Sequence, residues 1–170
     1  MPFNLRPLEE PIPRDLGNRF GLVFLTLPVD VAGRRERLQE LTRRMAAIKG
    51  SREGPVSYAI LKAMGLTPPR VESRIVDIFT AKASAMTTNV PGPREQVYMA
   101  GTRLGTVLVW APVSGSVGMT VSIFSYHDGV TIGLLVDAGL VPEPQVIAHH
   151  AEAELAELAR LAPLAGSGRR

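Results

Sequence analysis

Thr88-Asn89-Val90-Pro91-Gly92-Pro93 lies between a helix-like stretch and a long uncharged run rich in β-branched residues, and it marks where helices give way to strands. Its two prolines each hold φ at about −65° and remove a backbone donor, and Gly92 between them can adopt angles that a side chain would forbid. The stretch therefore predicts a rigid, shaped loop. Two interpretations stay open: a structural turn in which Thr88 and Asn89 bond to nearby backbone, or a loop that lines a binding site.

Upstream of this loop, the sequence predicts one strand followed by three helices. Residues 20–27 form a short apolar run typical of an interior strand, which Pro28 ends. Asp30 is expected to cap the first helix, residues 56–64 form the second, and Pro69 occupies the first turn of the third. The apolar faces of the first and third helices are expected at Leu38, Leu41, Met45, Ile48, Val71, Ile75, Ile78 and Phe79.

Downstream of the loop, residues 104–126 contain no Asp, Glu, Lys or Arg. The run is long enough for a membrane span, but Pro112 and the glycines and serines at 114–118 interrupt it. Its β-branched residues instead favour two buried strands. Strands are expected at 84–89, 97–100, 104–112, 119–126 and 130–136, with Asp128-Gly129 as a hairpin turn before the last of them.

The order of the elements defines the expected fold class. A strand, three helices, four or five strands and a final amphipathic helix at 142–161 show no strict strand–helix alternation. The sequence therefore predicts an α+β sandwich, with a mixed β-sheet and helices mainly on one face. We expect one domain over residues 1–164 and a loose tail over residues 165–170.

Composition narrows the classes of function. The chain has no cysteine, which excludes disulfides and thiolate ligands, and its three histidines argue against a metal site. Its start lacks the apolar run of a signal peptide, so a cytoplasmic location is predicted. One basic cluster could be a solvated helix face or could attract anionic lipid or a phosphorylated cofactor, and without interleaved aromatic residues it does not predict nucleic-acid binding. The cluster comprises Arg34, Arg35, Arg37, Arg43, Arg44, Lys49 and Arg52.

Six pieces of sequence, in order between residues 2 and 161, make the chain recognisable. They are Leu16-Gly17-Asn18-Arg19-Phe20-Gly21-Leu22-Val23, Lys82-Ala83-Ser84 with the loop that follows, Tyr98-Met99-Ala100-Gly101, Ser114-Gly115, Ser122-Ile123-Phe124-Ser125-Tyr126 and Asp137-Ala138-Gly139-Leu140-Val141-Pro142. Together they resemble the C-terminal domain of the bacterial wax ester synthase/diacylglycerol acyltransferase (WS/DGAT) family. The resemblance implies the C-terminal half of the CoA-dependent acyltransferase fold.

The resemblance also implies a reaction: transfer of a fatty acyl group from the substrate acyl-CoA to diacylglycerol or a long-chain alcohol, without a further cofactor. In that family the general base is a histidine in a His-His-x-x-x-Asp-Gly loop of the N-terminal half. These 170 residues lack that loop, so no catalytic residue is expected here. His149-His150 imitates its opening but falls within the final helix, where His150 and Glu154 are expected to form an i,i+4 pair. His127 is expected in a hairpin turn.

Two functional hypotheses follow. In the first, the chain is one half of an O-acyltransferase, inactive alone, which works with an N-terminal catalytic half in cis or in trans and associates peripherally with the inner membrane or lipid inclusions. In the second, it is a non-catalytic lipid-binding or acyl-CoA-binding partner module.

Trp110, the only tryptophan, is expected to be a core or interface anchor. Ser114-Gly115 could place backbone donors near a carbonyl or phosphate, or could simply connect strands. The candidate tunnel or interface residues are Thr88, Asn89, Pro91, Gly92, Ser114 and Gly115.

Overall fold

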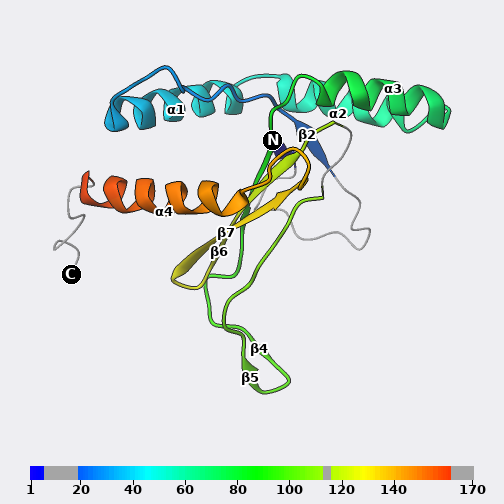
Figure 1. Ribbon diagram of the computed structural model, residues 1–170. Coiled ribbons are helices and arrows are strands. Elements are labelled where there is room, and N and C mark those ends of the chain that lie inside the picture. Colours follow the sequence, from blue (N-terminus) through cyan, green and yellow to red (C-terminus); the bar gives the residue numbers. More distant parts are fainter. Residues whose placement is uncertain (6–18, 113–115, 162–170) are drawn as a thin grey trace. The chain divides into compact units, whose positions relative to one another are not determined.

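The computed structural model describes residues 1–5, 19–112 and 116–161 of the chain (Figure 1). It divides into two compact units, one formed by Met1–Phe24 with Arg52–Pro142 and the other by Leu25–Ser51 with Glu143–Arg170. The first unit contains the strands and two helices, and the second contains the remaining two helices. Four helices and a mixed sheet confirm the predicted α+β class. The tail predicted at 165–170 lies outside the described residues.

The main sheet of the first unit has three strands in the order β3-β6-β7. β6 (Met119–Tyr126) and β7 (Gly129–Val136) form an antiparallel hairpin in which Tyr126 pairs with Gly129. The predicted hairpin is therefore confirmed, but its two turn residues are His127 and Asp128, and His127 adopts the left-handed φ of 51°. β6 also pairs in parallel with β3, so the central strand has one parallel and one antiparallel neighbour.

β3 (Met86–Pro91) confirms most of the strand predicted at 84–89 and corrects the loop predicted at 88–93, because the strand extends two residues further, to Pro91. The strand continues through Thr88 and Asn89, and Pro91 still lies in register with Ser125. A proline is tolerated here because β3 is an edge strand, where a missing N–H can be accommodated. Pairing even continues past the strand, since the Gly92 amide donates to the carbonyl oxygen of Ser125 at 2.8 Å.

Residues 104–112 do not form the predicted strand. They are attached to β6 by side chains instead of by a backbone ladder. Three hydroxyl groups of β6 make these bonds, and they fall at positions an even number of residues apart, which places them on one face of the strand. We call them the hydroxyl row: Thr120 donates to the Ala111 carbonyl at 2.9 Å, Ser122 donates to the Val109 carbonyl, and Tyr126 donates to the Leu104 carbonyl at 3.0 Å.

A short hairpin precedes this segment. β4 (Tyr98–Met99) and β5 (Thr102–Arg103) are antiparallel strands of two residues each, in place of the longer strand predicted at 97–100. Ala100 and Gly101 form the turn between them with positive φ angles of 48° and 81°. Two left-handed residues in a two-residue loop match the twist of paired strands and give a tight hairpin.

The rest of the first unit packs around a second small sheet. β1 (Pro2–Asn4) and β2 (Phe20–Leu22) are antiparallel, and α2 (Glu53–Met64) contacts β2. The Leu22 amide donates to Ser57 Oγ at 2.8 Å, and both Val23, which follows β2, and Met64, at the end of α2, are buried. The predicted strand at 20–27 is thus shorter than expected.

α3 (Pro69–Thr80) begins at its predicted proline. The ring of Phe79 near its end stacks on Phe24, with 6.2 Å between ring centroids.

The second unit is a pair of contacting helices, α1 (Arg34–Lys49) and α4 (Pro144–Leu161). α1 begins after Gly33, not at the predicted cap Asp30. No residue within either helix is buried, so the expected apolar face of α1 is only partly covered. Among the described helices, none combines the length and the apolar character needed to cross a membrane.

Candidate functional site

The sequence-predicted candidates lie at the end of the sheet edge formed by β3. Thr88 is half-buried, whereas Asn89 and Pro91 are exposed. Their exposure leaves them accessible, and their role in a passage or interface stays a prediction. Ser114 and Gly115 lie outside the described residues, so the structure does not place them beside this edge.

Gly92 follows β3 at a point of close packing. A Cβ built on it would lie 2.6 Å from Phe124 Cζ and would also overlap the carbonyl oxygen of Ser125. Its φ is not among the positive angles of the described residues. Glycine is therefore required at this position by space, and not by the unusual backbone angle that the sequence suggested.

Tyr126, at the end of β6, joins the sheet to the β4–β5 hairpin. Its hydroxyl accepts hydrogen bonds from Gln96 Nε2 at 2.8 Å and from the Val97 amide at 3.0 Å. The same hydroxyl donates to the Leu104 carbonyl, so it binds both sides of the hairpin base. With 8% of its surface exposed, the residue holds this junction from a buried position. Sequence reasoning missed this role, although Tyr126 ends a recognised motif.

The hairpin presents large side chains to solvent. Tyr98 is 63% exposed and Met99 67%, and a Cβ added to Gly101 would find no other atom within 4 Å. Exposed aromatic and methionine side chains at a rigid turn are typical of a binding element. The hairpin is therefore a second candidate contact surface, and its signal in the sequence is the recognised piece Tyr98-Met99-Ala100-Gly101.

Trp110 is not a core residue. Half of its surface is exposed, and its indole lies over β7, where a Cβ on Gly133 would come within 3.2 Å of Trp110 Nε1. The core interpretation is therefore wrong, and the interface interpretation stays a prediction.

The motif at residues 137–142 has a structural role. Asp137 Oδ1 accepts hydrogen bonds from the amides of Gly139 at 2.8 Å and Leu140 at 3.1 Å, which closes a turn after β7. The turn carries the Leu140 side chain over Gly118, where a Cβ would lie 2.5 Å from Leu140 Cδ1. This explains why the turn and the glycine occur together.

The three histidines lie at two places, one in the β6–β7 turn and two next to each other on α4. His127 lies in the β6–β7 turn with its Nδ1 3.1 Å from Asp128 Oδ2, and His149 and His150 are exposed on α4. The predicted pair between His150 and Glu154 is wrong, because arginines of α1 bind the Glu154 carboxylate instead.

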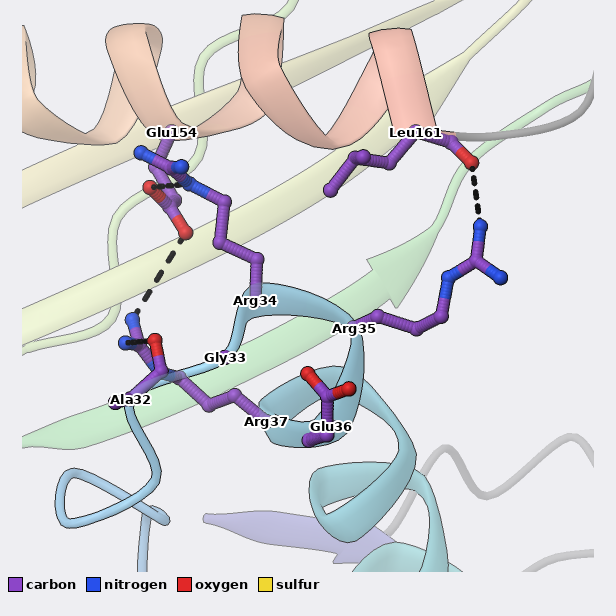
Figure 2. A pocket seen from close by; sticks show the side chains of 8 residues that line it. All are labelled: Ala32, Gly33, Arg34, Arg35, Glu36, Arg37, Glu154 and Leu161. Carbon is purple, nitrogen blue, oxygen red and sulfur yellow. Dashed lines mark hydrogen bonds and ion pairs between the residues drawn. The ribbon is translucent and has the colours of Figure 1, made fainter.

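Figure 2 shows these arginines around a cavity of about 480 Å³ in the second unit. Arg34 Nε lies 2.9 Å from Glu154 Oε2, and Arg37 Nη1 lies 3.8 Å from Glu154 Oε1. Arg35 Nη2 donates to the carbonyl oxygen of Leu161 at 3.3 Å. The hydrogen bond to Glu154 and the charge of this carboxylate raise the pKa of Arg34 above its usual value.

Two further arginines of the basic cluster bind a glutamate on their own helix. Arg43 and Arg44 each donate to Glu40 at 2.7 Å, and these hydrogen bonds lower the pKa of Glu40 to about 2. The basic cluster is therefore more than a solvated helix face, since five of its arginines make bonds within the second unit. In the described part of the chain, no three His, Cys, Asp or Glu side chains come together to hold a metal ion.

Comparisons with known proteins agree with the sequence motifs. The chain is 25% identical over 175 residues to a putative diacylglycerol O-acyltransferase of Mycobacterium tuberculosis, covering 99% of this chain and 35% of that protein. It is 24% identical over 144 residues to the O-acyltransferase WSD of Acinetobacter baylyi, covering 83% of this chain and 31% of that protein. The chain thus spans about a third of the length of the curated relatives it matches. No solved structure matches it at a significant level.

A sequence model of one family covers most of the chain. The family is described as WS/DGAT C-terminal domain, and the match extends over residues 16–159, which include α1 to α3, all but the last two residues of α4, and every described strand except β1. This chain belongs to the WS/DGAT C-terminal domain family.

Proposed function

We propose that this chain is the non-catalytic half of an O-acyltransferase that transfers fatty acyl groups from acyl-CoA to diacylglycerol or a long-chain alcohol. It works with an N-terminal half that carries the general base, in cis or in trans. The observation that carries the proposal is the family match over residues 16–159 in a chain that spans about a third of its relatives.

The placement of the histidines supports a non-catalytic role. A general base must reach the proton of the attacking hydroxyl within about 3 Å and in a site that excludes water. His127 lies in an exposed turn, and His149 and His150 are exposed on a helix. None of these environments keeps water away from a thioester, so the base is expected on the N-terminal half.

The exposed sheet edge and hairpin support a role in assembling the site. Asn89 and Pro91 at the edge, and Tyr98 and Met99 on the hairpin, are accessible to a second domain. We expect these surfaces to line the acyl passage or to contact the N-terminal half. Peripheral association of the assembled enzyme with the inner membrane or lipid inclusions is part of this proposal, because its acceptor lipids reside there.

The test measures acyl transfer from labelled palmitoyl-CoA to diacylglycerol and to hexadecanol. We expect no turnover from the chain alone, and turnover once an N-terminal half with the His-His-x-x-x-Asp-Gly loop from the same organism is supplied. The proposal is overturned if the chain alone is active and the substitution His127→Ala, His149→Ala or His150→Ala abolishes that activity.

A second candidate function is a lipid-binding or acyl-CoA-binding module. The half-exposed indole of Trp110 over β7 favours it, because such an aromatic surface can bind an apolar chain. As the only tryptophan, it also provides the assay: palmitoyl-CoA should change its fluorescence saturably. A flat titration, with Trp110→Phe as the blank, would remove this candidate.

A further inference from the structure

We propose that the cavity between the start of α1 and the C-terminal half of α4 binds a phosphate monoester through Arg34, Arg35 and Arg37. All the residues of this site lie in the second unit, outside the six recognised pieces of sequence. Of the two ligand sources named below, only coenzyme A rests on the proposed function.

The three arginines come from one turn of α1 and line the cavity. Figure 2 shows that their guanidinium groups point in different directions and do not meet at one place. Arg34 and Arg37 approach the same Glu154 carboxylate from two directions, while Arg35 extends towards the end of α4. The side chains of Arg34 and Arg37 remain 47% and 42% exposed, so solutes can reach them. A second cavity of about 590 Å³ is lined by the same two arginines and adds Arg160.

Glu154 shows what kind of group this arrangement accepts. Its carboxylate is an internal anion that already engages two guanidinium groups. A phosphate monoester carries more charge and a third acceptor oxygen, and planar guanidinium groups bind phosphate oxygens in pairs. In place of the Glu154 carboxylate it would bind Arg34 Nε and Arg37 Nη1, and Arg35 would join them by exchanging its bond to the Leu161 carbonyl for one to phosphate.

The charges around the cavity make displacement of Glu154 feasible. Three arginines line the cavity together with two carboxylates, Glu36 and Glu154, so a positive charge remains. An ion pair as exposed as Arg34–Glu154 adds little stability. Breaking it therefore lowers the binding constant of a competing anion by a factor of about five or less. An incoming dianion competes against a weak internal partner.

Two kinds of ligand carry a phosphate monoester of this type: coenzyme A, at its 3′-phosphate, and phosphatidic acid, in its headgroup. Calorimetric titrations of the whole chain at low salt would compare coenzyme A with 3′-dephospho-coenzyme A. Co-flotation would compare phosphatidylcholine vesicles with and without phosphatidic acid. Preference for coenzyme A by roughly tenfold or more assigns the soluble source, and capture only by phosphatidic acid assigns the headgroup.

Four variants test the assignment, each checked for folding by circular dichroism. Arg34→Gln and Arg35→Gln should weaken binding at least about fivefold, through loss of a charge-assisted bond. Arg43→Gln is the matched control, because Arg43 lies on the same helix but binds Glu40, and it should leave affinity unchanged. Glu154→Gln should strengthen binding by up to about fivefold, because it removes the internal competitor.

The sign of the Glu154→Gln effect separates a binding site from a structural ion pair. If Arg34→Gln fails to fold, the Glu154→Gln and Arg35→Gln titrations decide the question. The proposal is overturned if no probe binds up to about 5 mM, which covers millimolar affinities, or if Arg43→Gln weakens binding as much as Arg35→Gln.

Discussion

Removing one oxygen atom, with Tyr126→Phe, should weaken the attachment of the β4–β5 hairpin to the sheet. The Tyr126 hydroxyl accepts from Gln96 Nε2 and the Val97 amide and donates to the Leu104 carbonyl. Phenylalanine keeps the ring that fills the site but cannot make any of the three bonds. The Gln96 side chain keeps other acceptors, since its Nε2 also lies 2.6 Å from the Leu104 carbonyl.

The size of the effect follows from what is left unpaired. A net hydrogen bond contributes about 0.5–1.5 kcal/mol, and an unpaired donor in a sheltered position costs about 1–3 kcal/mol. The Val97 amide loses its partner in a part-buried position, while the Leu104 carbonyl retains Gln96. We therefore expect Tyr126→Phe to lower the free energy of unfolding by about 2–3 kcal/mol. At roughly 2–4 °C per kcal/mol for a chain of this size, the melting temperature should fall by about 4–12 °C.

Thermal and urea unfolding followed by circular dichroism measure the global cost, and hydrogen exchange measures the local one. The Val97 amide should exchange roughly 30-fold faster in the variant, which corresponds to about 2 kcal/mol. Tyr98→Phe is the matched control, because its ring is 63% exposed, and it should change stability by less than about 0.5 kcal/mol. A cost below that limit for Tyr126→Phe, or equal costs for both variants, would refute the role of the hydroxyl as the hairpin's anchor.

Three further substitutions test other contacts. Gly92→Ala should destabilise the chain by about 1–3 kcal/mol in urea unfolding because its Cβ would overlap β6, whereas Gly105→Ala, with no atom within 4 Å, should be neutral. Asp137→Ala should cost about 1 kcal/mol by removing the acceptor of two turn amides, and Asp137→Asn should restore most of it; equal costs would contradict this account. The lowered pKa of Glu40 makes a contribution to stability that is complete above its usual value of 4.5 and is lost as pH falls towards about 2. Melting temperatures measured across that range should therefore fall more steeply for the wild type than for Glu40→Gln, and parallel curves would count against the Arg43 and Arg44 contacts.

Local patterns predicted much of the fold. The start of α3 at Pro69 follows from a residue whose fixed φ suits a first helical turn. The β6–β7 hairpin follows from two β-branched runs separated by polar residues with turn preferences. The family motifs were sufficient to identify the family, because several short pieces occur in a fixed order.

Features that depend on distant neighbours were not predictable. Pro91 reads as a loop residue, and it lies in a strand only because β3 has a single neighbour. Residues 104–112 have the composition of a strand, but both edges of β6 are paired with β3 and β7, and carbonyls of the segment bind the hydroxyl row of β6 instead. The bond between Arg34 and Glu154 joins positions 120 residues apart, so spacing within α4 pointed to the wrong partner.

The hydroxyl row of β6 also affects how the sequence of residues 104–111 can change. Thr120, Ser122 and Tyr126 bind carbonyl oxygens, which every amino acid has, so the attachment makes no demand on the side chains of residues 104–111. Half-exposed Leu108 and Trp110 are accordingly free to be selected for what they contact outside the sheet. Substitutions in residues 104–111 can alter binding while the segment stays in place, whereas loss of a hydroxyl from β6 would weaken its attachment whatever its sequence.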